Sequence, residues 1–174
     1  MALHDCQHTF ENLASTVLPQ YMDKMREAMF CAEPLSRFAE KGVGVKTLLK
    51  RRALAEDFPG CYVMLEAEKP LYVGISRSVI GRLRQHVTDT THYGASLAYR
   101  IAASMHREDL DLPKTRSERM MDPRFASSFA AAQERLRATT VAYLEIGNPL
   151  ELYVFEAYCA LELDTGQFNS FETH

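Results

Sequence analysis

GCYVMLEAEKPLYVGISRSVIGRLRQH, residues 60–86, is the segment with the clearest structural pattern in this chain. β-Branched and aromatic residues predict two short strands, Cys61 to Glu66 and Leu71 to Ile75. The connection between them is short and polar, so an antiparallel hairpin is the simplest arrangement. Alternate residues of the first strand face opposite sides, with Tyr62, Met64 and Glu66 on one face and Cys61, Val63 and Leu65 on the other.

A helix follows the hairpin. Ser76 and Ser78 are both possible caps for its first turn. The helical spacing then produces an apolar stripe of Val79, Leu83 and Val87. Arg82 and His86 are four residues apart and therefore share a second face of the same helix. The hairpin and this helix thus bring two tyrosines, an arginine and a histidine to one end of the predicted sheet.

This combination resembles the GIY-YIG nucleases. GCY at 60–62 corresponds to the first triplet of that family, and YVG at 72–74 corresponds to the second. The arginine on the following helix and the histidine one turn later extend the likeness. Cys61 stands where the family has isoleucine, and its side chain is predicted to point away from Tyr62. The resemblance is specific as an ensemble, because either triplet alone carries little information.

A third strand is predicted at Thr139 to Ile146, where residues again alternate. Asn148 and Pro149 then form a strong helix start, with Asn at the cap and Pro in the first turn. On that helix, which is predicted to run to about Leu163, Glu156 lies inside an apolar stripe. An inward carboxylate is costly unless it is paired or coordinates a cation.

The resemblance implies a glutamate on the helix after the third strand and an asparagine about a dozen residues later. Glu156 and Asn169 fit these positions. The implied fold is mixed α/β: a small, three-stranded, mainly antiparallel sheet flanked by helices. It covers residues 59–174, with a helical insertion at about 107–138. Residues 107–122 of the insertion are charged and broken by Pro113, and one interpretation is a loop that orders on substrate. Residues 1–58 are predicted to be a helical N-terminal extension, including a helix over Gly44 to Asp57.

The resemblance also implies a catalytic site. Its expected catalytic residues are Tyr62, Tyr72, Arg82, His86 and Glu156. The expected substrate-binding residues are Gly74, Ser76, Arg84, Arg100 and Asn169. Arginine suits a phosphate because its planar fork offers several donors. A tyrosine or His86 would act on the attacking water; a free phenol has a pKa of about 10, so a tyrosine base requires nearby positive charge.

The expected cofactor is one Mg²⁺ or Mn²⁺ ion held by Glu156. A divalent cation would act as a Lewis acid toward the leaving oxygen, and magnesium suits one carboxylate with several retained waters. The expected partner is nucleic acid, with DNA favoured over RNA. The ending FNSFETH is similar to the restriction-enzyme-like branch of the family. That likeness implies a homodimer that cuts both strands, since one site cuts one strand.

Composition sets the remaining bounds. The 174 residues suit one domain, and hydrophobic and charged contents of 47% and 25% are those of an ordinary globular protein. No apolar run approaches the roughly 20 residues that span a membrane, and no signal peptide is expected. Four scattered cysteines without a C-x-x-C pair favour reduced thiols and a cytoplasmic location. Residues 113–138 carry six basic and three acidic groups, whereas residues 139–174 carry six acids and no Lys or Arg.

Two alternatives to an active nuclease remain open. The first is a catalytically inactive module of the same fold that binds nucleic acid or protein. The second is a nuclease toxin or effector domain. Taken singly, each site residue has an ordinary explanation, such as a strand aromatic, a surface arginine or an exposed histidine. Only their joint order and spacing favour the nuclease.

Overall fold

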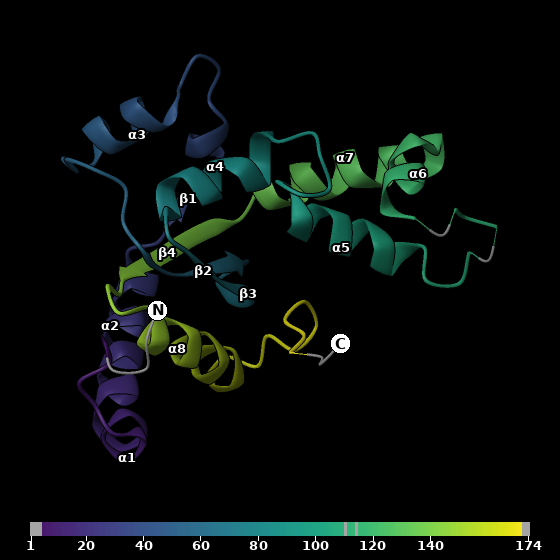
Figure 1. The fold of residues 1–174 in the computed structure, drawn as a ribbon. Coiled ribbons are helices and arrows are strands. Elements are labelled where there is room, and N and C mark those ends of the chain that lie inside the picture. Colours follow the sequence, from purple (N-terminus) through teal and green to yellow (C-terminus); the bar gives the residue numbers. More distant parts are fainter. Residues whose placement is uncertain (1–4, 110, 114, 172–174) are drawn as a thin grey trace.

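The fold is known from a computed structural model, which describes residues 5–109, 111–113 and 115–171 (Figure 1). The chain begins with α1 (Phe10–Asn12), the π-helix η2 (Leu13–Val17), α2 (Leu18–Phe30), β1 (Glu33–Pro34), the 3₁₀-helix η3 (Leu35–Ala39) and α3 (Val45–Arg51). The hairpin region follows as β2 (Gly60–Glu66), β3 (Lys69–Ser76), α4 (Val79–Thr88) and α5 (Ser96–Met105). The last elements are α6 (Arg116–Met121), α7 (Pro123–Arg137), β4 (Thr140–Glu145) and α8 (Pro149–Glu162).

The sheet has four strands in the order β1-β4-β2-β3, and every neighbouring pair is antiparallel. The mixed α/β class and the antiparallel hairpin are therefore confirmed, whereas the prediction of three strands is wrong. The additional strand, β1, is only two residues long and pairs with the start of β4. A pair this short has no alternation to detect, so the sequence pattern could not reveal it. β3 is the edge strand that lies next to β2.

Side-chain and backbone contacts hold β1 in place. The Arg52 guanidinium donates to both carboxylate oxygens of Glu33, at 2.9 and 2.6 Å, and the Tyr143 hydroxyl donates to the same carboxylate at 2.9 Å. Just beyond the strand, the Leu35 amide donates to the Thr139 carbonyl at 2.9 Å. The strand β1 is therefore held by residues that lie far from it in the sequence.

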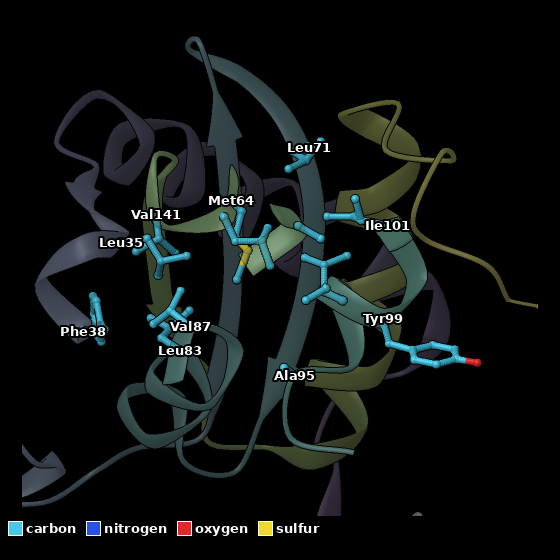
Figure 2. Close-up of a cluster of buried hydrophobic side chains, with 14 of the residues drawn as sticks. Leu35, Phe38, Met64, Leu71, Leu83, Val87, Ala95, Tyr99, Ile101 and Val141 are labelled. Carbon is cyan, nitrogen blue, oxygen red and sulfur yellow. The ribbon is translucent and has the colours of Figure 1, made fainter. Parts of the chain in front are cut away.

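Helices cover both faces of the sheet, so β2 is buried on both sides. Tyr62 and Met64 face a cluster formed with α4, α5, α7 and η3, whereas Cys61, Val63 and Leu65 face a second cluster formed with α2 and α8. The alternation predicted for this strand is confirmed. Figure 2 shows the first cluster, in which Met64 lies in the middle, between Val141 and Leu71.

The first 58 residues contribute to both clusters. Leu18 and Met22 of α2 pack in the cluster with α8, and Phe38 and Leu48 pack in the cluster with Tyr62. The domain boundary near residue 59 stays a prediction. The helix predicted over Gly44 to Asp57 is shorter than expected, because it ends at Arg51 and Ala53 adopts a left-handed φ of 55°.

The charged region 107–122 was interpreted as a loop, but α6 occupies Arg116–Met121. Thr115 caps α6, because its hydroxyl accepts a hydrogen bond from the Glu118 amide. Leu110 and Lys114 lie outside the described residues. No helix in the described ranges is both long and apolar enough to cross a membrane.

Candidate active site

Three aromatic rings meet on the face of the sheet that α4 covers. The Tyr62 hydroxyl and His86 Nε2 share a hydrogen bond of 2.8 Å. The ring centroids of Tyr62 and Tyr72 are 6.3 Å apart, and those of Tyr72 and His86 are 6.2 Å apart. Tyr62 and His86 are 1% and 0% exposed, whereas Tyr72 is partly exposed. The group therefore has a buried interior and one tyrosine that reaches the surface.

The hairpin register brings these rings together. Tyr62 of β2 pairs with Gly74 of β3, and Met64 pairs with Tyr72. A Cβ atom added at Gly74 would lie 2.5 Å from both Cζ and the hydroxyl of Tyr62. Gly74 was expected to allow a tight turn beside the site. Instead it lies inside β3, where its missing side chain makes room for the Tyr62 ring.

Helix α4 positions Arg82 and His86, and a distant carboxylate fixes its first turn. Asp57 accepts hydrogen bonds from the Ile80 and Gly81 amides, both at 2.9 Å. Ser78 is the N-cap residue, as expected, but its side chain makes no cap hydrogen bond, and Asp57 serves the first turn instead. Asp57 lies more than twenty residues upstream, which is why local sequence rules missed it.

Arg82 connects α4 to the start of α5. Its guanidinium donates to the Gly94 carbonyl at 2.8 Å and to the Ser96 hydroxyl at 2.7 Å. These two bonds occupy two of the five N–H donors of the side chain. A third, longer hydrogen bond runs to the Gln85 side chain at 3.3 Å. The positive charge of Arg82 also acts on both Tyr62 and Tyr72 and opposes the rise in their pKa values. Arg82 is thus partly committed to structure and still acts on the aromatic group.

Burial is the main influence on the pKa values of the three residues in the aromatic group. It raises the pKa of Tyr62 well above the usual phenol value and also raises that of Tyr72. It lowers the pKa of His86 well below the usual imidazole value, and the charges of Arg82 and Arg100 lower it further. At neutral pH both phenols are therefore protonated and the imidazole is neutral. Positive charge alone does not make either tyrosine a base here.

The His86 ring is only half satisfied. Its Nε2 contacts Tyr62, but its buried Nδ1 has no hydrogen-bond partner in the described chain. Such an atom costs free energy relative to a hydrogen-bonded one. Packing around the fully buried ring and the Tyr62 hydrogen bond hold it in place despite this cost.

Glu156 approaches the group from the opposite face of the sheet. Its neighbours on α8, Leu152 and Cys159, pack in the cluster with α2, as the predicted apolar stripe requires. Burial raises the pKa of the Glu156 carboxyl, and Arg100 partly offsets the rise. The charge of Glu156 in turn raises the pKa of Tyr72. Because β3 is an edge strand, groups from both faces can act on Tyr72 around that edge.

The structure offers Glu156 as a single open oxygen donor. Nowhere in the described residues do three or more His, Cys, Asp or Glu side chains form a group that could hold a metal. Glu156 itself accepts no hydrogen bond from the described residues. Mg²⁺ commonly binds through one carboxylate, its own waters and substrate phosphates. The donor set therefore fits a hydrated Mg²⁺ or Mn²⁺ completed by substrate and does not fit an all-protein cage.

The remaining predicted substrate contacts separate into two groups. Arg100 of α5 donates to the Phe168 carbonyl at 2.9 Å and acts electrostatically on Tyr72, His86 and Glu156, so it belongs with the site. Asn169 is tied to the edge strand: its side chain accepts from the Val73 amide at 3.0 Å and donates to the Val73 carbonyl at 2.7 Å.

Arg84 and Ser76 make local contacts instead. Arg84 donates to the Val43 carbonyl at 3.1 Å and to the Thr88 hydroxyl at 3.1 Å, on another side of α4 from Arg82. The Ser76 hydroxyl donates to the Ser78 carbonyl in the turn before α4. In the ending FNSFETH, residues 172–174 lie outside the described residues.

A second carboxylate on α8, Glu151, was not among the predicted site residues. It is more buried than Glu156. Its carboxylate accepts a hydrogen bond from the Tyr21 hydroxyl at 2.7 Å. Burial, and then this hydrogen bond, raise the pKa of Tyr21 to about 12. This pair joins α8 to α2 and has a structural role.

Comparison of the chain with protein-family models, with curated proteins and with solved structures finds no match in any of the three.

Proposed function

We propose that this chain is a divalent-metal-dependent endonuclease of the GIY-YIG kind, acting on DNA in preference to RNA. One observation carries the proposal. Tyr62, Tyr72 and His86 form a single aromatic group, and the charges of Arg82, Arg100 and Glu156 act on members of that group. These residues come from five different elements, β2, β3, α4, α5 and α8. Two arginines together with one inward carboxylate are a suitable set for an anionic diester.

The two arginines would bind the scissile phosphate. Each retains N–H donors beyond those used within the protein, and guanidinium groups match phosphate oxygens in pairs. Glu156 would hold the divalent ion, which when bound supplies Lewis-acid stabilisation of the leaving oxygen. Tyr72 is the partly exposed member of the aromatic group, so it would contact the substrate directly.

The Tyr62–His86 pair provides a path for the proton of the attacking water. As the water oxygen bonds to phosphorus, its proton passes to the Tyr62 oxygen, the Tyr62 proton passes to His86 Nε2, and the bond to the leaving oxygen breaks. His86 is neutral and can accept this proton. A phosphate bound between Arg82 and Arg100 would offset their charge, which would bring the His86 pKa back toward its usual value.

Plasmid nicking tests the proposal. Supercoiled DNA and a matched RNA are incubated with wild-type protein and Mg²⁺, and then with Glu156→Gln and Arg82→Ala. Removing the proposed metal-binding carboxylate or a proposed phosphate ligand is expected to reduce cleavage at least a hundredfold. Matched controls are Glu162→Gln, which changes an exposed acid on the same helix, and Arg77→Ala, which changes an exposed arginine just before α4.

Cleavage that survives both site variants would refute the proposed site. Loss of cleavage in the two control variants as well would show only a general charge effect. A wild-type protein that cuts RNA faster than DNA would overturn the substrate preference. Cooperative appearance of linear product would support a homodimer that cuts both strands.

A second candidate function is a non-catalytic binding module of the same fold. Two observations favour it: Tyr62 and His86 are almost fully buried, and Arg82 donates to groups of its own chain. This function predicts that labelled nucleic acid binds with no cleavage at any Mg²⁺ concentration and that Glu156→Gln leaves the affinity unchanged.

A further inference from the structure

A pocket beside the candidate active site is lined by arginines. It encloses about 440 Å³ between α5, the start of α6 and the segment after α8. Its lining includes Arg100, Arg107 and Arg116, and none of the described residues that line it is an aspartate or a glutamate. The whole chain has a formal charge of −3, so this pocket is a local concentration of positive charge in an acidic protein.

Two of these arginines are available for a ligand. Arg107 is exposed and makes no hydrogen bond or ion pair with any described residue. Arg116 is also exposed; its guanidinium carbon lies 5.4 Å from the centre of the Tyr99 ring, and it forms no ion pair in the described chain. Arg107 also borders a neighbouring pocket that contains Glu108 and Asp109, but Asp109 is already bonded to His106 at 2.6 Å.

Arg100 links the pocket to the candidate active site. It lines the pocket, and its charge acts on Tyr72, His86 and Glu156. Its bond to the Phe168 carbonyl fixes the segment that forms the opposite wall. A chain of phosphates bound at the aromatic group would therefore continue along the row from Arg100 to Arg107 and Arg116.

The lining indicates which part of a nucleic acid would bind. Tyr99 and Phe168 are both buried, so neither offers an open face for base stacking. Guanidinium groups without an aromatic platform favour phosphate oxygens over bases. Figure 2 shows the Tyr99 ring pointing away from the middle of the core cluster. The Arg116 guanidinium lies over this ring. The aromatic ring thus supports an arginine here.

We infer that this pocket, through Arg107 and Arg116, binds backbone phosphates of the nucleic acid that flank the scissile phosphate. The inference rests on the proposed nuclease function and adds a second phosphate subsite, independent of sequence, to the one at Arg82. Each contact to a duplex phosphate contributes about 0.9 to the dependence of log affinity on log salt concentration.

Binding of a fluorescently labelled DNA duplex tests the inference. The full chain carries Glu156→Gln throughout, and EDTA is present, so that no DNA is cut. The fluorescence anisotropy of the duplex is measured between 50 and 200 mM salt, with and without the additional pair Arg107→Ala and Arg116→Ala. The pair is expected to weaken binding at least tenfold and to reduce the salt slope by about 2. The control pair, Lys41→Ala and Lys46→Ala, removes the same charge from exposed positions near α3, far from α5 and α6 (Figure 1).

Unchanged binding by the arginine pair, or an equal loss in both pairs, would overturn the inference. Displacement of the duplex by millimolar inorganic phosphate at constant ionic strength would also overturn it, because the pocket would then be a site for a free anion. Plasmid cleavage distinguishes the two proposals. If the wild type cuts DNA but the arginine pair binds normally, only the subsite fails. If the arginine pair weakens binding but the wild type does not cut, the subsite stands and the nuclease fails.

Discussion

Gly74→Ala tests how the aromatic group is assembled. The added Cβ would lie 2.5 Å from both Cζ and the hydroxyl of Tyr62 and 2.9 Å from a third ring atom. The Tyr62 ring cannot easily move away, because it is 1% exposed and its hydroxyl is bonded to His86. Glycine to alanine in a strand normally stabilises a protein by about 0.5–1 kcal/mol, so the general rule and this structure predict opposite signs.

The expected net effect is a loss of about 2 kcal/mol. Overpacking of a filled core costs about 1–3 kcal/mol, and a weakened Tyr62–His86 hydrogen bond costs about 0.5–1.5 kcal/mol. The intrinsic gain from alanine offsets part of this sum. For a chain of this size, 1 kcal/mol shifts the melting temperature by roughly 2–4 °C, so Gly74→Ala is expected to melt about 4–8 °C lower.

Urea and thermal unfolding, followed by circular dichroism, measure the effect. Gly147→Ala is the matched control, because no atom lies within 4 Å of a Cβ added there. A second test repeats Gly74→Ala in a Tyr62→Leu background, where the ring atoms that clash are absent and the cost should nearly vanish. The reasoning is refuted if Gly74→Ala is as stable as the wild type, or if its cost is the same in both backgrounds.

Three further predictions concern residues that support the site. The folded-state pKa of His86 lies below the unfolded value of 6.5, so the unfolded chain takes up a proton first as the pH falls; stability should drop below pH 6.5 by up to about 1.4 kcal/mol per pH unit. Comparing wild type with His86→Gln by urea unfolding at pH 5, 6 and 7.5 should show this slope only in the wild type, and parallel curves would contradict it. Asp57→Ala removes two hydrogen bonds to the first turn of α4 and should lower the free energy of chemical unfolding by about 1–2 kcal/mol. A change below about 0.5 kcal/mol, the range of ordinary surface substitutions, would show that this cap is unimportant. Arg52→Met removes the two-pronged partner of the largely buried Glu33 carboxylate, which keeps the Tyr143 hydrogen bond and a 3.8 Å contact to the exposed Arg37. The change should lower the unfolding free energy by about 2–4 kcal/mol. Adding Glu33→Gln should restore part of that loss, and a further loss would count against the pairing.

Periodicity predicted the parts of the fold that depend on one element at a time. The faces of β2 follow from the two-residue repeat of a strand, and Val79, Leu83 and Val87 are fully buried, as the helical repeat of α4 required. Asn148 caps α8 through hydrogen bonds from the Leu150 and Glu151 amides, as its position before a proline indicated.

Contacts between segments far apart in the chain were not predictable in this way. The strand β1 exists because Arg52 and Tyr143 hold Glu33, and the cap of α4 comes from Asp57. The sequence placed His86 on the same helix face as Arg82, but depth of burial depends on what the rest of the chain packs over that face. Neither periodicity nor spacing carries this information.

The position of β3 at the edge of the sheet explains why the candidate site can include both Tyr62 and Glu156. These side chains belong to opposite faces of the sheet, and a central strand would lie between them. Because β3 is an edge strand, the charge of Glu156 acts on Tyr72, which lies beside Tyr62. An exposed edge also invites pairing with another chain. Asn169 prevents this at Val73 by bonding both its amide and its carbonyl. The same segment presents the Phe168 carbonyl to Arg100, so one short stretch after α8 both protects the edge and positions an arginine beside the aromatic group.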